Sequence, residues 1–355
     1  MKTSVRLTTG LLFTILAAVF LAPVIQVNTL PLLGVALVAS IIPMPKCVAR
    51  DGIVLEHWAN YIVERLWKDN GFLRFAYDDS RYADGSGRII HIPQPGSKPA
   101  VQKNRSVFPA AAVRRADTDV LYALDEYTTD PTHIPNIDAI DISYDMQDSV
   151  LGDHMQVLNE LVANDMLIKW ATNGTVYKTT GGAGAATVGP IDGQVGNRLG
   201  LHHSDFKKLM IKANVDNVDK NNRYALVDDN MYEFFYDSLS ETMQRDFSRM
   251  VDAANGVVGK IHSWNILTRS SVIAANNADA IKALDAAIGA TDSLGCIAWQ
   301  KNSVAFAIGA KKLFQDKDNP IYYGDIHSAL VMAGGRVRRG DSKGIYTIIQ
   351  GTPQA

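Results

Sequence analysis

Glycines and histidines gather in residues 174–206, GTVYKTTGGAGAATVGPIDGQVGNRLGLHHSDF. Closely spaced glycines can cradle a phosphate, and paired histidines can bind a metal ion. A Walker-type phosphate loop needs a lysine after its last glycine, whereas here Pro190 and Ile191 follow. On a helix, the adjacent His202 and His203 would point about 100° apart and could not chelate one ion together. The stretch therefore predicts a glycine-rich connector rather than a phosphate or metal site.

A second set of side chains with possible chemistry is acidic and lies between residues 117 and 145. Paired carboxylates can act as acid and base, or can bind hard metal ions. However, Ile140, Ile142 and Tyr144 alternate with polar residues, which is the pattern of a half-buried strand with one solvated face. No regular ligand spacing appears, so a structural role is favoured. The acidic residues are Asp117, Asp119, Asp125, Glu126, Asp130, Asp138, Asp141 and Asp145.

Motifs of nucleophilic or zinc-dependent enzymes, such as GxSxG and HExxH, do not occur in the sequence. Cys47 and Cys296 are too few for a disulfide framework or a four-cysteine zinc site, and two reduced thiols are favoured over one bridge. Asp228 and Asp229 follow an apolar strand-like segment, where capping of the next helix explains them. The sequence predicts no catalytic residue, no cofactor and no metal site.

The overall charge gives no footprint for nucleic-acid binding. The chain has 355 residues and a formal net charge of −2, whereas proteins that grip phosphates carry a basic excess or a basic stripe. A chain of this balance can still face DNA without adhering to it. Its length is sufficient for a substantial core and for two or more subdomains.

The N-terminal segment has a different composition. No charged residue occurs between Arg6 and Lys46, and the apolar runs there are long enough to span a bilayer. Three interpretations are open: a signal or membrane anchor, a hydrophobic arm buried in an assembly, or a start codon assigned upstream of Met44. Taken alone, the segment favours membrane targeting, and any membrane contact would be made through residues 1–43.

Helical spacing next predicts an amphipathic helix over residues 51–70. Its apolar stripe would pack on a core or on a neighbouring subunit, and the helix would end at Asn70-Gly71. Residues 78–115 predict a long projecting hairpin, with strands at 88–92 and around Val101 and a proline-rich tip. Such a hairpin has little core of its own, so we expect it to lie on a partner. The stripe consists of Leu55, Trp58, Ile62 and Leu66.

Residues 145–170 predict a spine helix of about 26 residues, or roughly 39 Å, that lies across a sheet. After the connector, we expect a helix capped by Ser204 or Asp205, and then a buried strand at 224–227 that leads into a further helix. The remaining segments predict a strand pair at 256–271 and a β-rich segment that leads into a helix-like piece near residue 314. After Pro320 we expect a helix or a strand, then a Gly-Gly turn and a closing strand at 345–349.

This order of elements resembles the major capsid protein of tailed bacteriophages, an α+β fold shared with encapsulins and the herpesvirus capsid floor. The resemblance covers about residues 51–351. Its most telling pieces are NNRYALVDDNMYEFFYD, GKIHSWNILTRSS, AWQKNSVAFAIGAKKLF and GDIHSALVMAGGRVRRGDSKGIYTIIQ. GRIIHIPQPGSKPAV and DEYTTDPTHI further look like capsid proteins of phages that infect Bacteroidetes-type bacteria.

The resemblance implies a shell subunit that self-assembles into the pentamers and hexamers of an icosahedral head. Its basic loop residues Lys98, Lys103 and Arg105 would pair with acidic surface on a neighbouring subunit. Scaffold, portal and decoration proteins are possible partners, and packaged DNA would be faced without sequence-specific binding. The protein would assemble in the host cytoplasm and reside in the virion. The alternatives are an encapsulin-type nanocompartment shell and a membrane-anchored or secreted enzyme.

The resemblance also implies a division of the chain. The apolar extension (residues 1–50) would be followed by the N-terminal helix (51–74), an extended loop (75–115) and a peripheral domain with the spine helix (116–175). A glycine-rich connector (176–194), an axial domain (195–325) and a return strand to the peripheral domain (326–355) would complete it.

Overall fold

The structure, a computed structural model, describes residues 68–83, 88–106, 108–109, 112–135, 146–191 and 193–353. They belong to one compact unit, Ala59–Ala355. Four predicted features lie outside the described residues: the apolar segment 1–43, the helical stripe with Leu55, Trp58, Ile62 and Leu66, the strand at 140–144, and Asp138, Asp141 and Asp145 of the acidic set. Within the described ranges, no helix is long and apolar enough to cross a membrane.

A seven-stranded sheet forms the centre of this unit, with the order β10-β11-β9-β13-β16-β6 and with β12 paired to β13. The β9–β11 and β6–β16 pairs are parallel, and the other pairs are antiparallel. Every residue of β13 is buried, as expected for a strand covered on both faces. The strands are β6 Thr175–Lys178, β9 Arg223–Asp228, β10 Val257–Ile261, β11 Trp264–Arg269, β12 Ile273–Ala275, β13 Ser293–Gln300 and β16 Ile345–Ile349.

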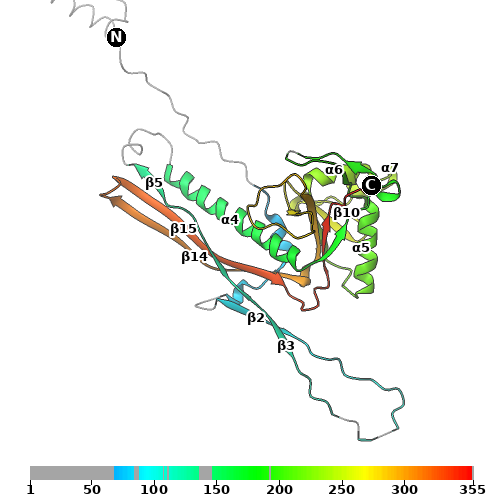
Figure 1. Cartoon of the computed structure of the whole chain (residues 1–355). Helices are drawn as coiled ribbons and strands as arrows, with labels where there is room; N and C mark the ends of the chain where they lie inside the picture. Colours follow the sequence, from blue (N-terminus) through cyan, green and yellow to red (C-terminus); the bar gives the residue numbers. More distant parts are fainter. Residues whose placement is uncertain are drawn as a thin grey trace, which may run out of the picture. The chain divides into compact units, whose positions relative to one another are not determined.

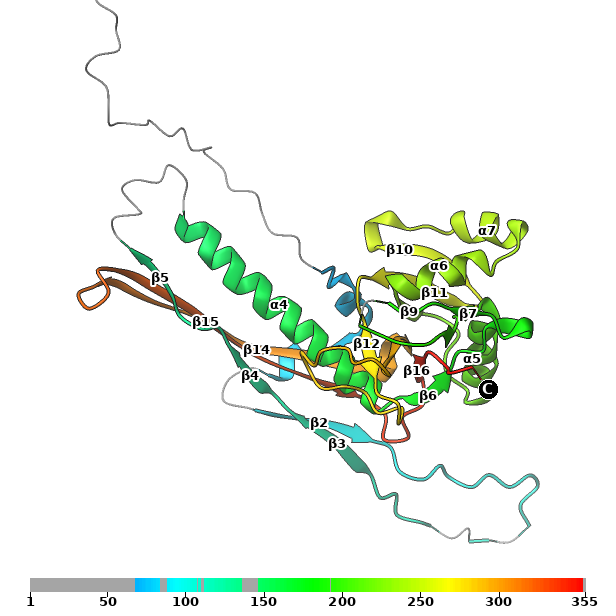
Figure 2. The same ribbon diagram turned by 45° about the horizontal axis from the view of Figure 1, so that its top comes forward.

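The two faces of this sheet pack against different apolar layers. Along β9, Ala225 and Val227 join a cluster with the helices α5 (His203–Val215), α6 (Asp229–Asp237) and α7 (Glu241–Ser248). Leu226 points the other way and joins a cluster with helix α4. Strand residues alternate between faces, so one short strand serves both layers. Figure 2 shows α6 and α7 beside β9, β10 and β11.

Helix α4, Met146–Thr172, is the predicted spine helix, and at 27 residues it spans about 40 Å. Its buried residues Leu158, Val162, Met166 and Trp170 recur every four positions, so they form one stripe. Figure 1 shows this helix lying along β14 and β15. The prediction of a long helix across a sheet is therefore confirmed.

The sheet beneath α4 has the order β1-β14-β15-β4, and β5 also pairs with β15. Indole Nε1 of Trp170 donates a hydrogen bond to the carbonyl of Ala305 at 3.1 Å and so ties the helix to β14. The strands are β1 Tyr77–Asp78, β4 Asp125–Thr128, β5 Thr132–Pro135, β14 Val304–Asn319 and β15 Gly324–Val337.

A separate two-stranded hairpin pairs β2 (Ile89–Gln94) with β3 (Thr118–Ala123). One face of it, with Ile90, Ile92 and Tyr122, contacts Ala307 of β14 in a small third cluster. The remaining short elements are η1 Gly71–Phe75, η2 Ser80–Tyr82, η3 Gly182–Gly184, η4 Ala253–Asn255, η5 Lys301–Ser303 and the strand pair β7 Thr187–Val188 with β8 Arg198–Leu199.

The structure corrects the prediction for the hairpin in two respects. Its second strand is β3, not a segment around Val101, which has no strand pairing. Residues 71–82 form η1, β1 and η2, with β1 paired to β14, so the hairpin begins later than residue 78. Prolines and polar residues at 95–109 cannot supply a pairing strand, which moves the return strand past residue 117.

The C-terminal third also differs from the prediction. Residues 304–319 form strand β14 rather than a helix-like piece, and Gly334-Gly335 lies within β15 rather than in a turn. A Cβ on Gly335 would come within 2.4 Å of Sδ of Met166, and one on Gly334 within 2.6 Å of the carbonyl oxygen of Ala123. The two glycines therefore allow close packing of neighbouring elements, not a chain reversal.

The glycine-rich connector contains more regular structure than expected. It holds β6, η3 and β7, and β6 completes the edge of the large sheet. The cap of α5 is His202, not Ser204 or Asp205, and Nδ1 of His202 accepts a hydrogen bond from the Ser204 amide. Asp205 acts as the reciprocal acceptor for the His202 amide, at 3.1 Å.

Candidate functional site

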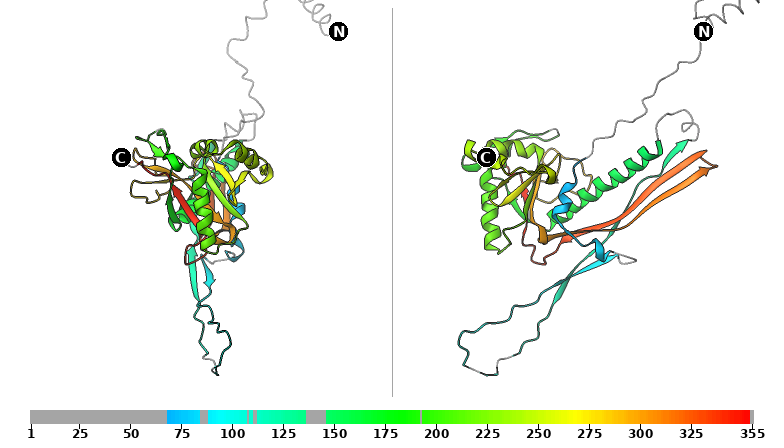
Figure 3. Two further views of the ribbon diagram at one scale, coloured as in Figure 1. Left: turned by 90° about the vertical axis from the view of Figure 1, so that its right-hand side faces the viewer. Right: turned by 180° about the vertical axis from the view of Figure 1, so that it is seen from behind.

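The β2–β3 hairpin exposes apolar side chains that no described residue covers. We call residues 95–117, which connect its strands, the extended loop. Figure 3 shows it continuing beyond β2 and β3 without a strand. Val101 is 91% exposed, Phe108 75% and Val113 85%. A two-stranded hairpin with so little core is marginally stable in isolation, so these side chains indicate a missing partner surface.

The extended loop is also strongly basic. It holds five basic residues and one acidic residue, Asp117. Nε of Arg115 donates to Oδ1 of Asp117 at 2.5 Å, and this hydrogen bond, with one from the Gly96 amide, lowers the pKa of the Asp117 carboxyl. The predicted contact residues Lys98, Lys103 and Arg105 lie together on this loop and have no ion pair with any described acidic residue. Their charge is available to a partner.

A network at the base of the hairpin anchors it to the rest of the chain. Asp79 is buried and accepts a hydrogen bond from the Tyr122 hydroxyl at 3.4 Å. Arg338 lies 3.9 Å from the same carboxylate, with its guanidinium 3.8 Å from the Tyr77 ring centroid. Burial raises the pKa of Asp79 although Arg338 opposes this effect. The network joins η2, β3 and the end of β15, so the hairpin is anchored at its root.

A second exposed apolar surface lies at the turn between β14 and β15, which we call the hairpin tip (residues 319–324). Ile321 is 76% exposed and Tyr323 78%. Oδ1 of Asn319 accepts a hydrogen bond from the Ile321 amide at 2.9 Å and stabilises the turn. Large exposed aromatic side chains are typical of association surfaces.

The residues that first suggested chemistry have structural roles. Asp228 caps α6: its Oδ1 accepts from the Asn230 amide at 3.0 Å, which confirms the predicted capping, and burial raises its pKa. Cys296 lies buried in β13, and burial raises the pKa of its thiol. The described part of the chain holds no group of three His, Cys, Asp or Glu residues placed to bind a metal ion.

Part of the predicted acidic set is already paired within the chain. Asp119 pairs with His91, Glu126 with Arg88, and Asp125 with Lys169, which also binds Asp165. The Tyr127 hydroxyl donates a hydrogen bond to Asp165, and burial together with this hydrogen bond raises the pKa of Tyr127. These carboxylates therefore hold β4 against α4 and β2 against β3.

Solved structures of phage capsids match this chain over most of its length. A structure from Mycobacterium phage Che8 is 17% identical with a TM-score of 0.54, and the match covers 84% of this chain and 98% of that chain. The capsid of cyanophage P-SCSP1u is 16% identical with a TM-score of 0.58, covering 85% and 94%. This chain has the phage capsid fold. The capsid of cyanophage Pam1 matches with a TM-score of 0.59 at 8% identity, covering 88% and 99%.

The capsid fold confirms the α+β class predicted from the sequence, although no protein-family model and no curated protein matches the chain. The basic residues of the loop were identified from the sequence as contact residues, whereas the hairpin tip was missed. A signal for the tip was present, because DKDNPIYYGD is a turn-rich segment between two apolar runs. Reading one of those runs as a helix concealed it.

Proposed function

We propose that this chain is the major capsid protein of a tailed bacteriophage, a structural and non-catalytic subunit that self-assembles into the icosahedral head shell around the genome. The observation that carries the proposal is the extent of the match: the fold corresponds to capsid subunits over nearly their whole length, up to 99% of the matched chain. An isolated domain shared with unrelated proteins would not give this coverage of both chains.

The surface of the chain supports a subunit that is completed by its neighbours. Val101, Phe108 and Tyr323 are exposed on projecting elements with little core beneath them. Such side chains favour aggregation in a monomer and are covered in an assembly. The net charge of −2 suits an inner wall that encloses DNA without retaining it.

The same proposal assigns each segment of the chain to a domain of the capsid subunit. Residues 75–115, which include β2 and most of the extended loop, would form the projecting part of the subunit. Residues 116–175 would form the peripheral domain and 195–325 the axial domain, with 326–355 returning to the peripheral domain. The stripe Leu55, Trp58, Ile62 and Leu66 and the basic residues Lys98, Lys103 and Arg105 would contact neighbouring subunits. Scaffold, portal and decoration proteins would be further partners, with assembly in the host cytoplasm and residence in the virion.

We further propose that the source phage infects Bacteroidetes-type bacteria. This part of the proposal is supported only by the motifs GRIIHIPQPGSKPAV and DEYTTDPTHI. The similar solved structures include those of phages named for other bacteria, namely Mycobacterium, Ralstonia and Helicobacter pylori. Adsorption and genome comparison of the source phage would test this part separately.

Electron microscopy of the purified protein tests the proposal. The chain is expressed once from Met1 and once from Met44, and closed shells are expected from at least one of the two. DNA inside particles purified from the source would support a phage head, whereas protein cargo would support the encapsulin alternative. Membrane-bound monomers from the Met1 start would contradict the proposal and favour the membrane-anchored enzyme.

A further inference from the structure

The extended loop requires a partner surface with two properties, because it presents both apolar and basic side chains. Val101 and Phe108 are exposed, and Lys98, Lys103 and Arg105 lack an acidic partner among the described residues. The complementary surface should therefore expose apolar side chains and carry carboxylates that have no basic partner within the chain.

Only one of the exposed apolar surfaces in the described part of the chain has a clear acidic excess. On α5, the surface with Ile211 and Val215 offers no unpaired carboxylate, because Asp205 and Asp216 pair with Lys208 and Lys212. The hairpin tip adjoins a part of β14 with charges of both signs, namely Lys311, Lys312, Asp316, Lys317 and Asp318. Neither surface offers charge complementarity.

Helices α6 and α7 meet both requirements. The segment from Asp229 to Asp252 contains six acidic and two basic residues. Met250 is 59% exposed and Val251 51%. Glu233, Asp237 and Glu241 are exposed, and none has an ion pair with a described basic residue. We call the surface formed by Glu233, Asp237, Glu241, Met250 and Val251 the acidic surface. It contrasts with residues 119–126, whose carboxylates are paired within the chain.

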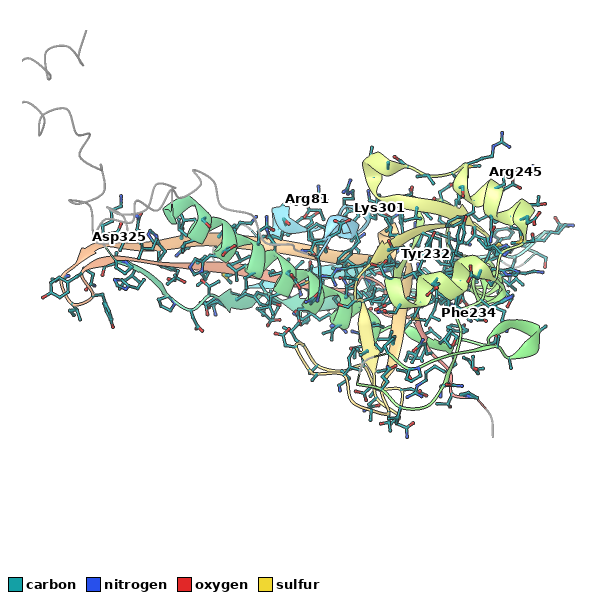
Figure 4. The ribbon with its side chains drawn as sticks, turned by 90° about the horizontal axis from the view of Figure 1, so that it is seen from above. Arg81, Tyr232, Phe234, Arg245, Lys301 and Asp325 are labelled. Carbon is teal, nitrogen blue, oxygen red and sulfur yellow. The ribbon has the colours of Figure 1, made fainter. Side chains whose placement is uncertain are left out.

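The local structure orients these carboxylates outward. Met231 and Phe235 of α6 are buried against the sheet. Glu233 and Asp237, four residues apart, lie on one exposed face, and Glu241 begins α7. Figure 4 shows Tyr232 and Phe234 on α6, with Arg245 of α7 pointing away from them. No basic residue lies within α6 to neutralise this face.

We infer that the extended loop of one copy docks on the acidic surface of a second copy, with Lys98, Lys103 and Arg105 facing Glu233, Asp237 and Glu241. The occupant is a second copy of this chain, because the same sequence supplies both halves of the complementary pair. This inference rests on the proposed self-assembly and adds the surface that receives the loop. Exposed charges of this kind fix register and accelerate association, and the apolar side chains beside them are dehydrated on docking.

A charge swap in the full-length chain tests the docking. One variant carries Lys98→Glu, Lys103→Glu and Arg105→Glu, a second carries Glu233→Lys, Asp237→Lys and Glu241→Lys, and a third carries all six changes. We expect each triple variant to lower the assembled fraction about tenfold or more, and the sixfold variant to recover most of it, because the attraction is restored with the signs exchanged. Wild-type association should also weaken as salt concentration rises.

Two controls separate docking from folding and from general charge effects. The variant Lys207→Glu, Lys220→Glu and Lys260→Glu changes three exposed lysines outside both surfaces and should assemble within about twofold of wild type. Circular dichroism melting of each variant shows whether the fold is kept. If a triple variant unfolds, the milder set Glu233→Gln, Asp237→Asn and Glu241→Gln replaces it, with a reduced salt dependence of association as the expected result.

The readouts distinguish this inference from the proposed function. Sedimentation velocity measures association of any size, and electron microscopy measures closed shells. Wild-type shells combined with an acidic-surface variant that assembles normally would overturn the docking and leave the capsid proposal intact. A folded sixfold variant that stays as defective as the triples would overturn the docking as well. A wild-type chain that associates and obeys the charge swap, but closes no shells even when it is co-expressed with the scaffold protein of its source phage, would overturn the capsid proposal alone.

Discussion

At the scale of single residues, Arg223 shows how a buried charge organises the fold. It begins β9, is fully buried, and has no carboxylate partner at hydrogen-bond distance among the described residues. Its guanidinium donates to the carbonyls of Asp219 and Val218, each at 2.7 Å, and to the Asn214 side chain at 3.0 Å. Burial lowers its pKa. One planar group thus satisfies acceptors at the end of α5 and in the loop that leads into the sheet.

Replacing Arg223 with lysine should lower the free energy of unfolding by about 2–4 kcal/mol, because a single ammonium in this buried position cannot reach all these acceptors and leaves partly buried carbonyls unpaired. Urea unfolding of the unassembled chain measures the loss. Arg245→Lys on the exposed face of α7 is the matched control, with an expected change below about 0.5 kcal/mol. Equal losses in the two variants would show that the geometry of the Arg223 guanidinium contributes nothing.

At the scale of elements, the contact between α4 and the sheet depends on a close approach. Met166 and Trp170 pack over Gly335 of β15, where a Cβ would meet Sδ of Met166 at 2.4 Å and the Ala305 carbonyl oxygen at 2.9 Å. Gly152, near the start of the same helix, has no atom within 4 Å of a Cβ position. The same substitution therefore meets opposite environments at the two glycines.

Gly335→Ala should destabilise the chain by about 1–3 kcal/mol, because the added methyl group forces the helix and the strand apart. Gly152→Ala should stabilise it by about 0.5–1 kcal/mol, because alanine loses less backbone entropy than glycine in a helix. Thermal unfolding monitored by circular dichroism compares the two variants. The opposite sign at either site would contradict this account of the packing.

Elements with strong local signals were predictable from the sequence. The helical spacing of apolar residues predicted α4 correctly, and the Asp228 cap predicted the start of α6, because helical periodicity and capping are local signals. β14 was predicted in part as a helix, and β15 as either a helix or a strand that ends at a turn, since Gly334-Gly335 resembles a turn until the Met166 side chain that lies over it is known. The basic loop residues could be found, but the surface they would contact could not. Asp125, for example, looks free in sequence although Lys169, 44 positions away, pairs with it.

At the scale of the whole molecule, protonation of buried histidines makes the stability of the fold depend on pH. His154 within α4, His202 at the cap of α5 and His262 beside β11 all have a pKa lowered by burial from the ordinary 6.5. Nε2 of His154 and Nε2 of His262 are buried and have no hydrogen-bond partner in the part of the chain that the structure describes. The neighbouring His327 further lowers the pKa of His154, and Asp153 opposes that effect.

The sign of the pH dependence follows from these directions. The unfolded chain binds protons at these histidines near pH 6.5, while the folded chain resists protonation until lower pH. The free energy of unfolding should therefore fall as the pH decreases from 7 to about 5.5. Asp117, Asp292 and Asp341 have lowered pKa values, so the stability they contribute above their ordinary 3.8 is lost only in more acidic solution.

Thermal unfolding of the unassembled chain at pH 7 and at about pH 5.5 measures this loss. His154→Gln should make the difference between the two melting temperatures smaller, because glutamine keeps a polar side chain of similar reach and does not titrate. His133→Gln, at an exposed position in β5, is the matched control and should leave the difference unchanged. A wild-type melting temperature that is equal or higher at the lower pH would mean that the histidines are charged in the folded chain, and the directions assigned to them would be wrong.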